Sequence, residues 1–375
     1  MTNYCNPFAG ELSLRGRYDR SNLARFIALC NMAVRARLPR TLRVLAMTAT
    51  LVLSSLSAVV TFADDTIKVL MLESPGQPLP SADAEKVEGL TGKIFFSGQS
   101  YSGSFEILRD KNGLHVINNL PFEKYIEGVV ASELGKDWEI EAMKAQAVIS
   151  RTYALLYKNI NSGDRFHLTS SVLHQLYKEG EDVEPAVKRA VNATKGEILM
   201  YGRDPVKAFY HATCEGRTEL PEEVWKESFP YLKSVECNCK NAPYESWQRR
   251  FSPEEISRAL GITGLKDIYI ASYTATGRAR TLKLLTETNE VKEVIATELR
   301  RALGYKELPS TDFSIKKTDT EIIFDGKGYG HGVGLSQWGA LEMAKEGRNY
   351  REILEHFYPG TTIKNTEELS SRNIP

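Results

Sequence analysis

The glycine-rich stretch 326–340 constrains the chain most, because glycine occupies every second position of its first half. A backbone that lacks side chains at alternate positions can be approached closely by a ligand or by another segment. Its spacing excludes two phosphate-binding loops, since no register gives G-x-G-x-x-G and no Gly-Lys-Ser/Thr triplet follows. Two readings remain open: a ligand-binding loop with Tyr329, His331 and Gln337 as its polar contacts, and a bulged strand that leads into a helix.

The rest of the chain predicts an α+β fold. Apolar runs separated by turn residues predict strands at 67–72, 92–96, 101–108, 114–117, 197–201, 206–211, 268–273, 281–285 and 321–324. Apolar periodicity and capping residues predict helices at 121–130, 137–158, 184–194, 251–259 and 292–303, with Ser252, Ser336 and Asn349 as caps. We therefore expect a small antiparallel β unit over residues 64–118 and a larger helix-and-sheet region over residues 119–375.

Residues 1–63 have the pattern of a secretory signal peptide. Several arginines precede an apolar run at 44–60, and small residues at 61–63 offer a cleavage site. Met32 would make a better start than Met1. The alternative is an uncleaved membrane anchor at 44–60, although hydroxyl side chains dilute that run. The pattern predicts a mature chain that starts near Asp64 and works in the periplasm or the cell envelope.

The charge balance argues against a nucleic-acid partner. The 375 residues carry a net charge of zero, with 26% charged and 42% hydrophobic residues. Lysines and arginines are spread along the chain after the first fifty residues, so no basic patch would track a phosphate backbone. This composition is typical of one large or two moderate globular domains.

Three cysteines, Cys214, Cys237 and Cys239, follow the predicted signal peptide. An odd number in an exported protein indicates one disulfide plus a free thiol, a metal site, or unpaired core residues. His211 lies three residues before Cys214, so a zinc site of three cysteines and one histidine is chemically possible. Because oxidation is favoured outside the cytoplasm, we predict a disulfide between Cys214 and one of the other two, and no required cofactor.

Glu133 is the sharpest catalytic candidate. It follows an apolar helix and precedes a glycine turn, where hydrophobic neighbours would raise its pKa and keep a general acid protonated. A solvated glutamate at a helix end would give the same pattern. On the next predicted helix, Lys144, Gln146 and Arg151 stand among alanines, either as solvated positions or as the polar lining of a cleft.

Four segments together resemble the stage II sporulation protein D family, which includes the amidase enhancers. They cover residues 120–133, 142–153, 210–218 and 328–337 and come in the family's order. The resemblance implies a peptidoglycan lytic transglycosylase whose helix-and-sheet core contains a glycan groove. It implies Glu133 as the acid/base catalyst and associates Arg151 with activity. The glycan contacts would be Lys144, Gln146, Tyr329, His331 and Gln337.

One carboxyl suits that reaction. Hydrolysis of a glycosidic bond normally needs two carboxylates about 5 to 10 Å apart. In a lytic transglycosylase the C6 hydroxyl of the muramic acid replaces water, so one group can donate and then accept a proton. The family also offers an alternative function, a glycan-binding protein without catalysis that stimulates an N-acetylmuramoyl-L-alanine amidase.

The chain departs from the family pattern at two places. Some members bind zinc through a His-x5-Cys-x4-His-Cys-Gln stretch, which here reads Ser162, Leu168, Leu173, His174 and Gln175. That zinc site is therefore absent. The usual Gly-Gly after the cysteine is Glu215-Gly216, which would alter the loop near the substrate.

Overall fold

The computed structural model describes residues 66–71, 83–96, 99–135, 137–170, 175–177, 183–239 and 241–371. The predicted signal peptide, the alternative start at Met32 and the alternative anchor at 44–60 lie outside these residues. Across the described ranges, every helix is too short or too polar to cross a lipid bilayer.

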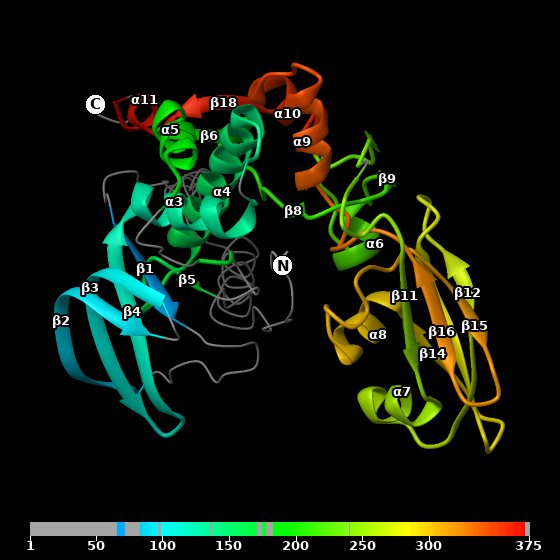
Figure 1. Ribbon diagram of the computed structural model, residues 1–375. Coiled ribbons are helices and arrows are strands. Elements are labelled where there is room, and N and C mark those ends of the chain that lie inside the picture. The colour runs from blue at the N-terminus through cyan, green and yellow to red at the C-terminus, as the bar shows by residue number, and fades with distance from the viewer. Residues whose placement is uncertain are drawn as a thin grey trace, which may run out of the picture. The chain divides into compact units, whose positions relative to one another are not determined.

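The described residues confirm an α+β fold (Figure 1). The first sheet has the strand order β2-β3-β4-β1-β5. Its members are β1 (Thr66–Met71), β2 (Glu85–Phe96), β3 (Gln99–Asp110), β4 (Gly113–Pro121) and β5 (Leu168–Thr169). The first four pair antiparallel, whereas β5 runs parallel to β1 and follows helix α4 in the chain, so the sheet includes a strand from outside residues 64–118.

Helices α3 (Phe122–Glu133) and α4 (Ile140–Ile160) form the centre of the main core. Pro121 lies just before α3 and not at its first helical position, and α3 continues three residues beyond the predicted end at 130. Helix α4 starts later than predicted because Asp137 takes a left-handed conformation, with φ of 62°. The buried alanines of α4 allow close packing against α3 and α5 (Pro185–Ala193).

The glycine-rich stretch packs against its own chain. Strand β17 (Leu335–Ser336) pairs in parallel with β8 (Tyr210–His211), which is the only strand within the predicted run 206–211. Gly334 has φ of +71°, and a Cβ there would lie 2.0 Å from the carbonyl oxygen of Phe209. The bare backbone therefore admits the neighbouring strand, which agrees with the strand-into-helix reading.

Two helices follow the glycine stretch, α9 (Gln337–Lys345) and α10 (Tyr350–Phe357). The predicted caps are confirmed: the Ser336 hydroxyl accepts a hydrogen bond from the Gly339 amide, and Asn349 forms a capping box with Glu352. The starts of the two helices are thus determined by local side chains, which is why they could be predicted from the sequence.

Residues 247–326 have a hydrophobic core of their own. They contain the sheets β11-β16-β15 and β12-β13-β14. The elements are β11 (Trp247–Phe251), α7 (Pro253–Leu260), β12 (Leu265–Tyr273), β13 (Ala279–Thr286), β14 (Val291–Ile295), α8 (Ala296–Leu303), β15 (Phe313–Lys317) and β16 (Ile322–Gly326). The single helix predicted at 292–303 is wrong in its first third, because residues 291–295 pair with β13 as strand β14.

The remaining elements are short. They are β6 (Glu197–Tyr201), β7 (Asp204–Pro205), β9 (Gly216–Arg217), α6 (Pro221–Trp225), β10 (Glu236–Cys237), β18 (Thr362–Asn365) and α11 (Thr366–Ser371). Strand β6 lies between β7 and β18 in a further three-stranded sheet, which joins the end of the chain to its middle.

Candidate functional site

The candidate site centres on Glu133, the last residue of α3. The helix ends there because Leu134 takes an extended conformation and Gly135 packs so tightly that a Cβ would lie 2.7 Å from the indole nitrogen of Trp138. Glu133 is only 1% exposed. A carboxyl at this helix end is therefore held in the protein interior, which excludes the reading of a solvated surface glutamate.

Hydrogen bonds from three other segments fix the Glu133 carboxyl. Oε1 accepts from the Leu176 amide and from the Tyr210 hydroxyl, both at 3.0 Å. Oε2 accepts from Nε2 of Gln337 at 3.3 Å. Tyr210 comes from β8 and Gln337 from the first position of α9, so the β8–β17 pairing brings both to the same carboxyl. All three donors are uncharged.

Burial raises the pKa of Glu133 from 4.5 to about 7, and the hydrogen bonds from Leu176, Tyr210 and Gln337 partly oppose this rise. Burial disfavours the carboxylate because the low-dielectric interior replaces its hydration, whereas the three donors favour it. The group is consequently divided between its acid and base forms near neutral pH, which suits a residue that must donate and accept a proton.

This raised pKa predicts a component of folding stability that depends on pH. The folded chain holds the Glu133 proton more tightly than the unfolded chain, so the contribution is complete below pH 4.5 and is lost as the pH rises to about 7. The expected loss is about 3 kcal/mol, at about 1.4 kcal/mol per pKa unit. Urea unfolding at pH 5 and pH 8 would measure it. Glu133→Gln should remove most of the difference, and an unchanged difference in that variant would contradict the assignment.

Helix α4 brings Gln146 to the same cluster. Its Oε1 accepts from Nε2 of Gln337 at 3.5 Å, and its own Nε2 donates to the Ser150 hydroxyl at 3.0 Å. Oε1 of Gln337 is buried and has no hydrogen-bond partner. A buried acceptor without a partner can receive a hydroxyl or amide N–H of a ligand. Gln146 and Gln337, both predicted to bind the substrate, thus lie beside Glu133.

Arg151 is buried in a different cluster. Its guanidinium forms a two-point ion pair with Glu123, with Nε–Oε1 and Nη2–Oε2 distances of 2.8 Å. It also donates to the carbonyls of Ala147, Val191 and Glu197. These contacts join α3, α4, α5 and β6, and none of them involves Glu133. Arg151 is therefore placed as a positioning residue for the helices, not as a partner of the carboxyl.

Lys144 also lies in other contacts. Its ammonium group forms an ion pair with Glu141 at 2.6 Å and lies 5.7 Å from the ring centroid of Tyr350. Glu141 in turn accepts from the Tyr350 amide, so the pair links α4 to α10. The side chain of Lys144 is 21% exposed. Neither partner belongs to the Glu133 cluster.

Tyr329 and His331 pack inside the protein. The ring of Tyr329 lies 4.4 Å from that of Tyr244, between centroids. Nδ1 of His331 accepts from the Val333 amide, and its ring packs on Trp225. Burial lowers the pKa of His331 well below its ordinary value, which keeps the ring neutral. Neither residue contacts the Glu133 carboxyl, although both were predicted to bind the substrate.

Sequence reasoning missed two of the three donors to Glu133. Tyr210 lies in a segment that carried the family resemblance, yet no polar pattern distinguished it from a core tyrosine. The Leu176 donor is a backbone amide, which no residue type can indicate. A hydrophobic strand end that contains one tyrosine, directly before a histidine, is the signal that could have drawn attention to Tyr210.

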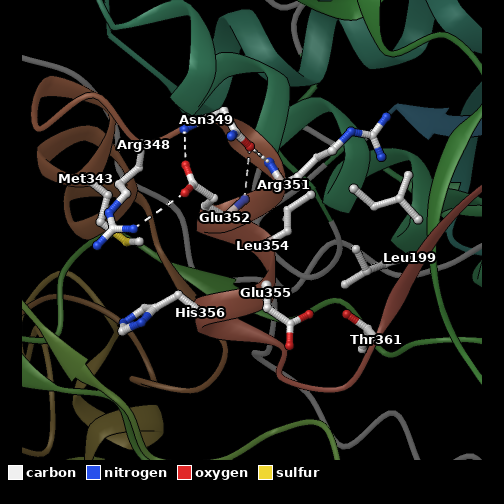
Figure 2. A pocket seen from close by; sticks show the side chains of 11 residues that line it. Leu199, Met343, Arg348, Asn349, Arg351, Glu352, Leu354, Glu355, His356 and Thr361 are labelled. Carbon is white, nitrogen blue, oxygen red and sulfur yellow. Dashed lines mark hydrogen bonds and ion pairs between the residues drawn. The ribbon is translucent and has the colours of Figure 1, made fainter.

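Two hollows of the described residues lie elsewhere. One of about 660 Å³ is lined by residues of α10, such as Arg351 and Glu352, and by Arg348 and other residues outside that helix (Figure 2). Another of about 720 Å³ is lined by Cys214, Cys237, Arg278 and their neighbours. Neither Glu133 nor its partners line either hollow, so neither is the predicted glycan groove at Glu133.

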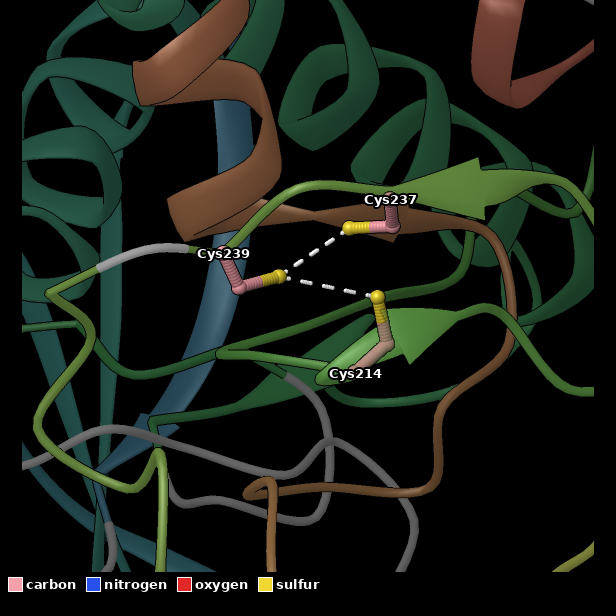
Figure 3. Close-up of side chains that lie close together, drawn as sticks. All are labelled: Cys214, Cys237 and Cys239. Carbon is pink, nitrogen blue, oxygen red and sulfur yellow. Dashed lines mark hydrogen bonds between the residues drawn. The ribbon is translucent and has the colours of Figure 1, made fainter.

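The three cysteines meet in one buried cluster (Figure 3). The Cys239 sulfur lies 3.6 Å from that of Cys214 and 3.0 Å from that of Cys237. All three are free thiols, so the predicted disulfide is not formed in this structure. The physical reason is the arrangement: a disulfide joins two sulfurs at about 2.0 Å, whereas here three sulfurs converge and no pair is set apart.

Two family models match the chain. Residues 110–201 match the model described as stage II sporulation protein, and this range contains Glu133 and Gln146. Residues 232–334 match a domain of unknown function, which includes the part with its own core.

Curated relatives cover most of the chain. The stage II sporulation protein D of Bacillus amyloliquefaciens is 34% identical over 285 residues, which span 72% of this chain and 81% of the relative. An uncharacterised protein of Brachyspira hyodysenteriae is 34% identical over 286 residues, 74% of this chain and 76% of the relative. The amidase enhancer of Bacillus subtilis is 28% identical over 288 residues, 64% of this chain and 40% of the relative. The chain therefore belongs to the stage II sporulation protein D family.

Proposed function

We propose that the chain is an exported peptidoglycan lytic transglycosylase in which Glu133 acts first as general acid and then as general base. One observation carries the proposal: a single buried carboxyl, held by uncharged donors, with its pKa raised to about 7. Family membership supplies the substrate class, the glycan strands of the cell wall.

The hydrogen bonds suggest which oxygen carries the proton. Oε1 already accepts two bonds at 3.0 Å, so we assign the proton to Oε2, whose one donor lies at 3.3 Å. In the first step Oε2 gives this proton to the glycosidic oxygen between MurNAc and GlcNAc. The bond from that oxygen to the anomeric carbon of MurNAc breaks, and GlcNAc leaves with a free hydroxyl. The carboxylate then takes the proton of the muramic acid C6 hydroxyl as that oxygen bonds to the anomeric carbon. The product is a 1,6-anhydro sugar, and Glu133 regains its proton.

The alternative function is a non-catalytic, glycan-binding amidase enhancer. Two observations favour it: a relative of that name, and the 1% exposure of Glu133. Acid catalysis requires the carboxyl to touch the glycan, so the proposed enzyme must open the contacts of Glu133 when a strand binds. An enhancer needs no such opening, and its partner would be an N-acetylmuramoyl-L-alanine amidase.

Export is part of the same proposal. Cell-wall glycan lies outside the cytoplasmic membrane, which agrees with residues 1–63 as a signal peptide. The mature protein would then consist of an N-terminal β region, residues 64–118, and a catalytic region, residues 119–375.

Product analysis of purified glycan strands tests the reaction. Mass spectrometry should find new ends that carry 1,6-anhydromuramic acid, because only attack by the sugar's own hydroxyl forms them. Ordinary reducing ends would contradict the proposal and indicate hydrolysis. Binding of strands without any cleavage, together with faster turnover of an added amidase, would establish the enhancer instead.

The pH dependence of kcat/KM provides a second test. The free enzyme must be protonated at Glu133, so kcat/KM is expected to fall as the pH rises through about 7. Tyr210→Phe removes a donor that lowers the pKa of Glu133, so the falling limb should move to higher pH. Profiles of the wild type and Tyr210→Phe, recorded on folded protein, would check this. A limb that does not move, or moves to lower pH, would refute the role of Tyr210.

A further inference from the structure

The sulfurs of Cys214, Cys237 and Cys239 lie close enough to share one metal ion. All three ligand atoms lie within 4.8 Å of one another, and the two shorter separations are 3.0 and 3.6 Å. Two thiolates bound to one tetrahedral zinc at about 2.3 Å stand roughly 3.8 Å apart. We propose that these three cysteines bind a zinc ion, at a position distinct from the Glu133 site.

The surrounding residues leave room for the sulfurs. Gly339 lies in the first turn of α9, and a Cβ there would lie 2.5 Å from the Cys237 sulfur. The Ser336 hydroxyl lies 3.3 Å from the Cys239 sulfur. Any side chain larger than hydrogen at position 339 would thus displace a sulfur from the cluster. The glycine at position 339 is therefore needed to keep the Cys237 sulfur beside the other two.

The electrostatic surroundings also favour thiolates. Three thiolates and one Zn²⁺ carry a net charge of −1, and the N-terminus of α9 directs its partial positive charge toward the cluster. The buried Arg278 lies alongside, where its Nη2 donates to the Cys214 carbonyl at 3.0 Å. Because Arg278 is itself paired with the buried Glu219, the N-terminus of α9 is the group that offsets part of the charge of the complex.

The fourth coordination position would be filled by a ligand that enters from the adjoining hollow. Among the described residues, the group of possible ligands contains only the three cysteines. Cys214 and Cys237 line the hollow of about 720 Å³, so water can reach the metal from that side. The site would therefore be built from three thiolates and one exchangeable ligand.

Such a metal would stabilise the segments that hold Glu133. Cys214 follows Tyr210 by four residues, and Ser336, beside Cys239, directly precedes Gln337. One ion would tie the segment after β8 to β10 and to Cys239, which contacts the residue before α9. Because metal binding that requires the folded chain adds to folding free energy, we expect thermal stability to fall when the metal is removed.

The test uses the full chain, purified under reducing conditions and supplied with Zn²⁺. Elemental analysis should find one zinc per chain, and Co²⁺ in its place should give a sulfur-to-cobalt charge-transfer band. Cys239→Ser should weaken zinc binding at least about tenfold and lower the melting temperature. The matched control is Cys5→Ser with Cys30→Ser, which removes the two other thiols and should leave zinc binding unchanged.

Two results would overturn the metal site. One is a fully reduced wild-type chain, with all five of its thiols titratable, that binds neither Zn²⁺ nor Co²⁺. The other is a chain isolated from the cell envelope with a disulfide within this cluster and no metal. The cobalt spectrum is measured on the wild type, so it remains decisive if a cysteine variant fails to fold. Neither readout depends on glycan cleavage, so the metal site and the proposed function can fail separately.

Discussion

Replacement of Glu133 by glutamine is expected to lower the rate of glycan cleavage by about 10²- to 10⁴-fold, or roughly 3 to 5.5 kcal/mol of activation free energy. Glutamine keeps the shape of the side chain but has no proton to donate. Its Oε1 can still accept from Tyr210 and Leu176. Gln337 can rotate its unpartnered Oε1 toward the new amide. Binding of glycan strands should therefore persist while cleavage is lost, which mass spectrometry and a binding assay would measure together.

The matched control is Glu127→Gln on the same helix. Glu127 is 8% exposed and pairs with Lys124 at 2.8 Å, outside the Glu133 cluster. The Glu127→Gln variant should retain nearly all of the activity. Wild-type turnover in Glu133→Gln would exclude the catalytic assignment. If both the wild type and Glu133→Gln bind strands and neither cleaves them, the enhancer function replaces the enzyme.

Arg151→Met is expected to destabilise the folded chain by about 1.5 to 3 kcal/mol, because it removes a buried guanidinium and leaves Glu123, whose side chain is 26% exposed, without its ion-pair partner. The variant also loses the hydrogen bonds to three backbone carbonyls. Since Arg151 is 1% exposed and contacts only structural partners, kcat per folded molecule should change little. Urea unfolding and kinetics below the unfolding transition would separate the two effects.

Lys144→Met on the same helix is the matched control for stability. The pair of Lys144 with Glu141 is partly exposed, so its loss should cost about 1 kcal/mol or less. An equal loss for the two variants would mean that burial does not strengthen the Arg151 pair. A fall in kcat of more than tenfold in fully folded Arg151→Met would instead indicate that Arg151 acts in catalysis and not only in stability.

Local signals explain what the sequence predicted of the fold. Ser252, Ser336 and Asn349 determine helix starts through their own side chains, and all three caps are confirmed. The helix prediction was wrong at residues 292–295 because the helical pattern of α8 was extended back over them. Their strand conformation depends on pairing with β13. A partner strand in the folded chain decides that segment, and no local pattern contains this information.

The site could be predicted only in part, for a similar reason. Glu133 and Gln146 were selected as polar residues in apolar surroundings, and Gln337 as a polar side chain of the glycine-rich stretch. The fold brings the three together. Arg151 has the same sequence signal, yet it faces α5 and β6 and not Glu133, since five positions along the helix turn its side chain about 140° away from that of Gln146. Tyr329 and His331 alternate with glycines. Their rings pack on Tyr244 and Trp225, which are distant in the sequence, so the sequence could not predict that they are buried.

The pairing of Trp247 with Gly326 means that the chain enters and leaves the region of residues 247–326 on neighbouring strands. These two ends lie about 5 Å apart, a distance that a short hairpin turn can bridge. The region has its own core and can therefore be exchanged as a module while the β8–β17 pair beside Glu133 is kept. One requirement limits the exchange: a replacement must supply a cation in place of Arg278, whose guanidinium donates to the carbonyls of Cys214 and Arg217. Evolution could thus replace this region without rebuilding the segments that hold Glu133.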